Sequence, residues 1–334
     1  MSVTMLMTSA EMQAEGGREK WLELRKNGIG GSDAGVIIGV NTFKNRFQLW
    51  LEKTDQGVEL ECSDEALERM EWGNRLEPVV ADWFEAKTGK KLRRCGMIRN
   101  NEYPFMFADV DRLVVGENAI VEIKTTAGYN KDEWADDKVP PSYMAQGLHY
   151  MAVGGYDKVY FVCLLGGQQA VIREMERDDE EIVALIEAEQ DFWENYVVPK
   201  VIPEVDGSDN CKKLLGKLYP GGEKEPMDMD GKWAAVCDNI KEMEEQMKQL
   251  QGFIDEKKNK LRLELGNFET GVVGDYKISY GVSTRNTFDA KAFALDYPDL
   301  VKTYTRTGQY RQLRVALTKE AKKRRAKEAE GEEQ

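Results

Sequence analysis

Histidine is almost absent from this chain of 334 residues, which contains only His149. One histidine excludes sites that need two, such as a zinc protease site, and leaves any hydrolysis to carboxylates, lysine or a hard metal ion. The five cysteines are odd in number and widely spaced, so neither a disulfide framework nor a zinc or iron–sulfur cluster is indicated. No apolar run reaches the roughly 18 residues that cross a bilayer, and residues 1–13 lack the features of a secretory signal. We therefore expect no membrane segment and a cytoplasmic location.

Acidic residues outnumber basic ones, with 60 Asp and Glu against 47 Lys and Arg and a net charge of −13. This balance argues against a surface that is basic throughout, as is common in nucleic-acid-binding proteins. Local clusters can still form a basic channel while acidic outer faces keep the protein in solution. Residues 87–94, with five Lys and Arg, are such a cluster.

The first 200 residues mix helical and strand patterns. Pro78 interrupts one helical pattern, and we expect it to begin a new helix or to kink the old one. The order of elements predicts an α/β fold, a mixed sheet flanked by helices. The expected helices are 18–26, 34–38, 66–88, 143–153 and 179–198, and the expected strands are 97–98, 106–108, 112–115, 119–125, 158–165 and 169–174.

Composition changes after Pro199. Residues 201–232 are rich in Pro, Gly and charge and read as a linker between a domain at 1–200 and an extension at 233–318. From Trp233 to Leu261, apolar residues recur at alternating spacings of three and four, broken only by Lys257, which predicts a long helix that packs on a partner. The extension then returns to short strands at 276–282 and 313–316 with a small helix between them, and a charged tail at 319–334 ends the chain.

Candidate catalytic chemistry lies between Asp109 and Lys124. Alternation in a strand places Glu122 and Lys124 on one face, while Val121 and Ile123 point into the core. A hairpin turn at Gly116 would return Asp111 close to Glu122. Two adjacent carboxylates repel each other unless a hard cation such as Mg²⁺ or Mn²⁺ binds between them. Lys124 beside them would orient a water molecule or offset charge on a phosphate.

Alone, this pattern is common in surface hairpins, where it forms an ordinary salt bridge. Its context makes it more specific. Glu77 precedes it in the segment Gly73 to Pro78, and Gln146 and Tyr150 follow it on one face of an expected helix.

The ordered set R-x2-G-I-G-G-S-D, G-x2-L-E-P, D-x-D-R-L, E-I-K and Q-x3-Y-M, which spans about residues 18–200, resembles the YqaJ-like viral recombinase nucleases. These are relatives of the bacteriophage lambda exonuclease in the PD-(D/E)XK nuclease superfamily. The resemblance implies a restriction-endonuclease-like sheet. The later block at 274–311 also resembles the tail of phage and prophage members.

The resemblance implies a set of metal ligands. Asp111 matches the metal-binding aspartate, Glu122 the second carboxylate and the carbonyl of Ile123 a further ligand, and Glu77 matches a helix carboxylate that approaches the metal. Relatives more often have a small residue or a proline near this aspartate, which leaves Asp109 as the alternative ligand to Asp111.

The resemblance also implies roles for five other residues. Lys124 matches the catalytic lysine, Gln146 the helix glutamine beside it, and Tyr150 a substrate-binding residue one turn further on. Arg25 and Ser32 match residues that hold the 5′-terminal phosphate.

Each of these residues also has an ordinary explanation. Glu77 can simply favour a helix start beside Pro78, Arg25 can be a surface charge and Ser32 a helix N-cap. Gln146 can be a surface amide. His149 is expected to be structural, because nothing beside it in the sequence suggests a base.

The implied reaction is Mg²⁺-dependent hydrolysis, 5′ to 3′, of one strand at the end of linear double-stranded DNA. The product would be a 3′ single-stranded overhang for a single-strand annealing protein, and relatives form homo-oligomeric rings around DNA. Two alternatives stay open: an endonuclease or single-strand nuclease of the same fold, and a catalytically silent DNA-binding recombination scaffold.

Overall fold

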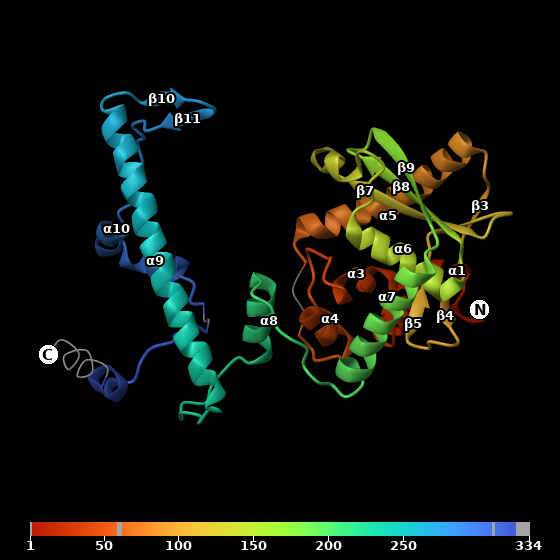
Figure 1. Cartoon of the computed structure of the whole chain (residues 1–334), viewed down its shortest axis with the longest axis horizontal. Coiled ribbons are helices and arrows are strands. Elements are labelled where there is room, and N and C mark those ends of the chain that lie inside the picture. The colour runs from red at the N-terminus through yellow and green to blue at the C-terminus, as the bar shows by residue number, and fades with distance from the viewer. Residues whose placement is uncertain (1, 59–61, 309–310, 325–334) are drawn as a thin grey trace. The chain divides into compact units, whose positions relative to one another are not determined.

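The computed structural model describes residues 2–58, 62–308 and 311–324 (Figure 1). The chain divides into two compact units, Met1–Pro220 and Gly221–Gln334, and each is described by itself. The expected linker at 201–232 contains helix α8 (Asp209–Leu218), whose Cys211 and Leu214 are buried in the core of the first unit. Of the expected charged tail at 319–334, residues 325–334 lie outside the described residues.

Helices of the first unit begin and end where the sequence supplies capping groups. Ser63 accepts a hydrogen bond from the backbone N–H of Ala66 at the start of α5, and Gly89 ends that helix in a left-handed conformation. Pro78 lies inside α5, which continues through it, so of the two expected outcomes a new helix does not form. Besides α8, the helices are α1 (Ser9–Gln13), α2 (Gly17–Lys26), α3 (Gly31–Ile37), α4 (Arg46–Lys53), α5 (Asp64–Thr88), α6 (Pro141–Gly154) and α7 (Asp179–Phe192), with a 3-10 turn η1 (Gly128–Trp134) and a π turn η2 (Trp193–Val197).

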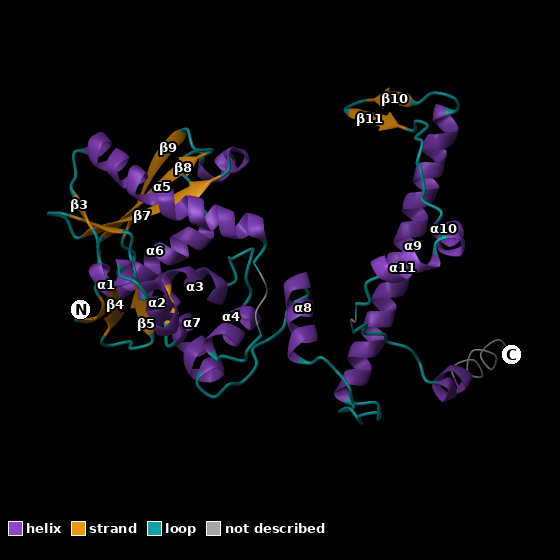
Figure 2. Cartoon of the chain, turned by 180° about the vertical axis from the view of Figure 1, so that it is seen from behind, coloured by secondary structure: helices purple, strands orange, loops and turns teal. Residues whose placement is uncertain are grey.

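A mixed five-stranded sheet forms the centre of the first unit (Figure 2). Its order is β3 (Leu92–Arg93), β6 (Arg112–Val114), β7 (Ala119–Thr126), β8 (Lys158–Leu165) and β9 (Gln169–Glu176). Strands β7 and β8 are parallel and the other neighbours are antiparallel. A second sheet has the order β1 (Val3–Met7), β4 (Met97–Asn100), β5 (Met106–Ala108) and β2 (Ile29–Gly30). The expected α/β fold is confirmed.

Helices cover both faces of the five-stranded sheet. Phe84 and Val80 of α5 pack with Val121 and Ile123 on one face, in a cluster that also includes Val162. On the other face α6 contributes its buried side chains to the larger core, which includes the odd-numbered residues 159–163 of β8. Because side chains alternate along a strand, β7 sends Val121 and Ile123 toward α5 and presents Glu122 and Lys124 on the α6 side.

The second unit begins with the long helix α9 (Lys232–Leu265), as expected from the heptad pattern. A hairpin of β10 (Thr270–Val273) and β11 (Tyr276–Ser279) follows, then α10 (Ala290–Asp296) and α11 (Pro298–Tyr304). The strand expected at 313–316 is wrong, because residues 311–318 form neither strand nor helix and Leu313 is 89% exposed. In the part of the chain that the structure describes, no helix is both long and apolar enough to cross a bilayer.

Candidate active site

The hairpin of β6 and β7 brings the expected carboxylates together. Arg112 pairs with Val121 in the antiparallel register, so Asp111, one residue earlier, faces Glu122. The Oδ2 atom of Asp111 accepts a hydrogen bond from the backbone N–H of Ile123 at 2.7 Å. Gly116 turns the hairpin with a φ of 85°, a conformation that glycine adopts without strain.

Lys124 and Gln146 form a network around one oxygen of Glu122. Lys124 Nζ donates to Glu122 Oε1 at 2.7 Å and to Gln146 Oε1 at 3.0 Å, and Gln146 Nε2 donates to the same Glu122 oxygen at 2.7 Å. Gln146 Nε2 also donates to the Tyr150 hydroxyl at 2.9 Å. The Lys124 ammonium lies 4.6 Å from the centre of the Tyr143 ring. These contacts hold the ammonium group at the site.

Tyr150 is buried rather than open to a substrate. Its side chain is 3% exposed, and a Cβ atom added at Gly31 would come within 2.5 Å of its ring. The absence of a side chain at Gly31 therefore lets α3 approach α6 at this point. In this arrangement Tyr150 acts on the site through Gln146.

The buried carboxylates of Asp111 and Glu122 are in an electrostatically unfavourable environment. Burial raises the pKa of Asp111 well above its usual value, and repulsion from Glu122 and Glu77 adds to this despite the attraction of Lys124. Burial likewise raises the pKa of Glu122, although Lys124 opposes the shift. Burial alone would lower the pKa of Lys124, but Glu122 and Asp111 outweigh it and raise that pKa, so Lys124 stays protonated.

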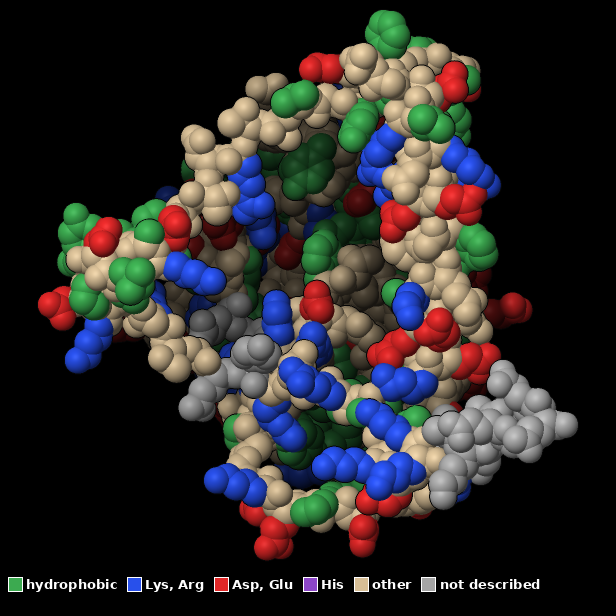
Figure 3. All heavy atoms as spheres, turned by 90° about the vertical axis from the view of Figure 1, so that its left-hand side faces the viewer, with side chains coloured by type: hydrophobic (Ala, Val, Ile, Leu, Met, Phe, Trp, Pro, Cys, Tyr) green, Lys and Arg blue, Asp and Glu red, His purple; other side chains and the backbone are tan. Residues whose placement is uncertain are grey.

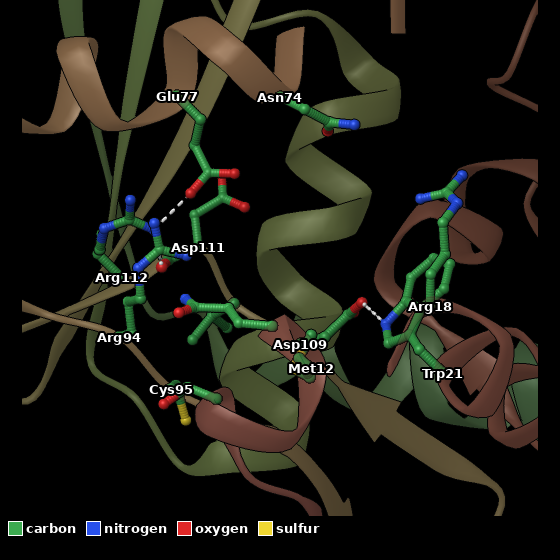
Figure 4. A pocket seen from close by; sticks show the side chains of 13 residues that line it. Met12, Arg18, Trp21, Asn74, Glu77, Arg94, Cys95, Asp109, Asp111 and Arg112 are labelled. Carbon is green, nitrogen blue, oxygen red and sulfur yellow. Dashed lines mark hydrogen bonds and ion pairs between the residues drawn. The ribbon is translucent and has the colours of Figure 1, made fainter. Parts of the chain in front are cut away.

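Glu77 on α5 lies beside Asp111 (Figure 4). Its Oε1 atom accepts a hydrogen bond from Arg112 Nη1 at 2.5 Å, and the same nitrogen donates to the Asp111 carbonyl at 2.6 Å. Arg112 is 6% exposed, whereas the Glu77 side chain is 27% exposed, so the ion pair is buried on the arginine side only. The position of Arg112 directly after Asp111 was the signal in the sequence that could have added it to the expected site.

Two hollows open onto these carboxylates. A cleft of about 1350 Å³ is lined by Glu77, Asp111, Glu122, Ile123 and Lys124 among others. A smaller cavity of about 280 Å³, drawn in Figure 4, shares Glu77 and Asp111 with the cleft. Residues that the sequence reasoning did not assign to the site also line these hollows. They are Arg69, Tyr129 and Lys138 in the cleft, and Arg18, Trp21 and Arg94 in the cavity.

Arg25 and Ser32 lie together, as the spacing of seven suggested. Arg25 Nη2 donates to Ser32 Oγ at 2.9 Å and to Asp33 Oδ2 at 3.1 Å. The guanidinium group of Arg25 lies 5.1 Å from the centre of the Trp21 ring. Asp33 is buried, and its pKa is depressed because attraction to Lys53 and Arg25 outweighs the opposing effect of burial.

Lys53 on α4 binds the buried carboxylate of Asp33 in this cluster. Its Nζ atom lies 2.8 Å from Asp33 Oδ2 and donates to the carbonyls of Arg25 and Gly28, each at 2.7 Å. Its side chain is 5% exposed. A lysine at the end of a helix, as Lys53 is in α4, is commonly a surface residue, so the sequence gave no sign of this role.

Asp109 and Asp111 face different neighbours. Asp109 Oδ2 accepts a hydrogen bond from the Trp21 indole at 2.8 Å and lies near Arg25, whereas Asp111 adjoins Glu122. Of the two, the geometry places Asp111 with the other expected ligands.

His149 contacts no expected site carboxylate. Its ring is completely buried between Glu189, at 2.8 Å from Nδ1, and the Phe107 carbonyl, at 2.8 Å from Nε2. A carboxylate and a carbonyl only accept hydrogen bonds, so both ring nitrogens donate and the imidazole is positively charged. This is the structural role expected for His149.

The carboxylates of Asp111, Glu122 and Glu77 are suitable ligands for a divalent cation, although each now accepts hydrogen bonds from other groups of the protein. Within residues 2–58, 62–308 and 311–324, no group of three or more Asp, Glu, His or Cys side chains is arranged to hold a metal ion as it stands. Glu122 Oε2 is nevertheless buried without a hydrogen-bond partner, and Asp111 beside it is repelled by its neighbours. An unpaired carboxylate oxygen next to a second carboxylate is the chemistry that a hard cation satisfies.

Comparison with known proteins supplies the family. Residues 20–157 match the YqaJ-like viral recombinase domain. The chain is also 38% identical over 309 residues to the YqaJ protein of Bacillus subtilis (strain 168), with 90% of this chain and 95% of that protein covered. The chain belongs to the YqaJ-like viral recombinase family. The expected family is thereby confirmed.

Solved structures similar to this YqaJ-like chain include two exonucleases. The alkaline exonuclease LHK-Exo of Laribacter hongkongensis is 20% identical, with 60% of this chain and all of that chain covered and a TM-score of 0.46. LHK-Exo has also been solved in complex with dAMP. A phage-related exonuclease of Haemophilus somnus 129PT is 16% identical, with 54% of this chain and 99% of that chain covered and a TM-score of 0.36.

Proposed function

We propose that this YqaJ-like chain is a Mg²⁺-dependent deoxyribonuclease, with Mn²⁺ as a possible substitute. It digests linear double-stranded DNA from the 5′ end of one strand and leaves a 3′ single-stranded overhang. The overhang would be the substrate of a single-strand annealing protein in phage-type recombination. We also propose that the chain acts as a homo-oligomeric ring, as the family resemblance implies.

The observation that carries the proposal is the convergence of Asp111, Glu122 and Lys124 at one cleft. Two carboxylates buried side by side, with one oxygen unpaired, destabilise a protein unless a cation or a proton offsets their charge, and such arrangements are common at functional sites. A structural salt bridge would need only one of them for Lys124. The arrangement therefore favours a cation site over the ordinary explanation of a surface ion pair.

Asp111, Glu122 and the carbonyl of Ile123 would hold the cation, together with Glu77 once it is released from Arg112. When bound, Mg²⁺ supplies Lewis-acid activation of the scissile phosphate and of a water molecule. Hydrolysis adds that water to phosphorus and breaks one P–O bond, and negative charge develops on the phosphate oxygens. Lys124 is protonated and fixed by Glu122 and Gln146, so it can offset this charge without reorganising.

Arg25 is suited to hold a 5′-terminal phosphate. Ser32 and Asp33 occupy one terminal nitrogen of its guanidinium group, while the planar fork has further donors that match phosphate oxygens. Trp21 and Asp33 fix the direction of the fork.

Digestion of linear duplex DNA labelled at the 5′ or 3′ end tests the activity. We expect the 5′ label to be released first in Mg²⁺ and no cleavage in EDTA. The variant Lys124→Ala should lose about 100-fold or more in rate, while Lys131→Ala, an exposed lysine on η1, should not. Cleavage by Lys124→Ala at the wild-type rate would refute the proposal, and cleavage of closed circular or single-stranded DNA at the same rate would favour the alternative nucleases.

The phosphate pocket is tested separately on duplexes with 5′-phosphate or 5′-hydroxyl ends. We expect the wild type to prefer phosphorylated ends and Arg25→Lys to lose most of that preference, because an ammonium group cannot bind the phosphate with two parallel hydrogen bonds. An unchanged preference in Arg25→Lys would assign the pocket to other residues.

A further inference from the structure

The last part of the second unit is basic, although the chain as a whole is acidic. Residues 285–324, the basic segment, contain ten Lys and Arg against four Asp and Glu, a net charge of +6, whereas the whole chain carries −13. Adding the acidic residues 325–334 still leaves a net charge of +4. Lys and Arg side chains gather in the lower half of the face shown in Figure 3, on the side where residues 319–324 lie in Figure 1.

Most cations of the basic segment lack an acidic partner. Along α9, exposed lysines pair with a glutamate three or four residues away. Among the residues that the structure describes, eight cations of the basic segment are exposed and form no ion pair. They are Arg285, Lys291, Lys302, Arg306, Arg314, Lys319, Lys322 and Lys323. Like charges gathered in this way repel each other, and a polyanion would relieve the repulsion.

Exposed aromatic rings alternate with these cations along the sequence. Phe288 is 69% exposed, Tyr297 is 54% exposed and Tyr304, at the end of α11, is 81% exposed. Phe288 and Tyr297 each pack against Phe293, with ring centres 5.0 and 5.2 Å apart. A ring that packing already holds in place loses little freedom when a flat group stacks on it.

We propose that the basic segment binds single-stranded DNA. Its Lys and Arg side chains contact phosphates and its exposed rings stack on bases, which is how proteins bind single strands without a preference for sequence. An acidic protein would match the charge but leave the rings unused. Duplex DNA would also match the charge, but its bases are stacked on each other and closed to the rings.

The identity of the strand rests on the proposed function. Digestion of one strand from its 5′ end leaves a 3′ overhang, which is single-stranded DNA produced by the same chain. A basic segment that binds this overhang keeps the product attached to the protein that made it.

Binding of the full chain to a closed circular single strand in EDTA tests the charged part of this surface without DNA ends or cleavage. The variant carries Lys302→Gln, Arg306→Gln and Arg314→Gln. We expect its affinity to fall about 100-fold at 0.1 M salt, and the slope of log K against log salt to fall by about 2, because each phosphate contact on a single strand contributes about 0.7.

The matched control removes three charges from the first unit. It carries Lys200→Gln, Lys212→Gln and Lys213→Gln, at exposed lysines, so the net charge of the chain changes equally. We expect this control to bind the circular single strand with nearly the wild-type affinity and salt slope. Equal losses in the two variants, or no loss in either, would overturn the proposal.

Tyr304→Leu separates stacking from charge. Leucine stays apolar but cannot stack on a base, so we expect about a tenfold loss of affinity for the circular single strand and no loss for closed circular duplex. Tyr276→Leu on β11, at a side chain 75% exposed, is the control and should bind like the wild type. Wild-type affinity in Tyr304→Leu, or circular duplex bound as tightly as the single strand, would overturn the proposal.

The proposed nuclease is scored in a separate assay. Failure of the wild type to digest linear duplex in Mg²⁺ would refute the nuclease. The titrations in EDTA decide whether the basic segment binds single strands, whatever the outcome of digestion.

Discussion

Replacing Asp111 by Asn should stabilise the protein in the absence of metal. The amide is nearly the same size, and its oxygen can still accept the hydrogen bond from the Ile123 N–H, now 2.7 Å long. The substitution removes a buried charge that lies beside Glu122 and Glu77. Stabilising changes at strained functional sites commonly contribute ~0.5–2 kcal/mol. For a unit of this size we expect a rise in Tm of about 3 °C.

The pH dependence of this gain has a definite sign. A carboxylate whose pKa is raised on folding binds its proton more tightly in the folded state, so the wild type loses stability as pH rises. The loss begins near the unfolded value of 3.8 and is complete above the raised pKa of Asp111. The excess stability of Asp111→Asn should therefore be small at pH 4 and largest at neutral pH and above.

Mg²⁺ should reverse the order of the two proteins. A cation that binds only the folded wild type stabilises it by about 2.7 kcal/mol at 100 times its dissociation constant, and Asp111→Asn should lose most of this gain. Thermal unfolding without DNA, in EDTA and in Mg²⁺, measures both effects, with the exposed Asp82→Asn as the control. If Asp111→Asn were clearly less stable than wild type in EDTA, Asp111 would be a structural partner of Lys124 and the cation site would be refuted.

Two further changes test the groups that support the site. Lys53→Met should destabilise the protein by about 3–5 kcal/mol in urea unfolding, because it leaves Asp33 buried without its main partner; a loss below 1 kcal/mol would contradict this. Burial lowers the pKa of His149 but Glu189 outweighs it, so the net shift is upward. The stability that the His149–Glu189 pair contributes is fully present below the unfolded pKa of 6.5 and is lost as pH rises through the raised pKa of the folded state. His149→Gln should therefore abolish this pH dependence of the unfolding free energy between pH 6 and 9.

Local patterns predicted the part of the site that neighbouring residues build. Strand alternation placed Glu122 and Lys124 on one face, and the glycine turn returned Asp111 to them, as the register confirms. Helical spacing placed Gln146 and Tyr150 together, and they share a hydrogen bond of 2.9 Å. In each case the chain between the partners is a short hairpin or a regular helix, so local geometry alone places the side chains.

Contacts across the fold were beyond such reasoning. Trp21 meets Asp109 across 88 residues, and Lys53 lies under Asp33 because α4 packs against α3. Glu189 stands among acidic residues of α7 that face solvent, and only tertiary packing shows that it is buried against His149. The strand wrongly predicted at 313–316 shows the converse, a local pattern that no tertiary contact supports. Its apolar alternation finds no neighbouring strand in the structure, and a strand without a partner cannot satisfy its backbone hydrogen bonds.

Charge balance links the buried site to the acidic composition of the whole chain. At the candidate cation site, the carboxylates of Glu77, Asp111 and Glu122 face the cations Arg112 and Lys124, which leaves a deficit of one positive charge when all five are ionised. A divalent cation turns this deficit into an excess of one, equal and opposite to the charge of a single phosphodiester. Attraction to DNA would then depend on the bound metal at this point rather than on a basic surface. A net charge of −13 is compatible with a DNA substrate on these terms, because outside the cleft it acts only through screened, long-range repulsion.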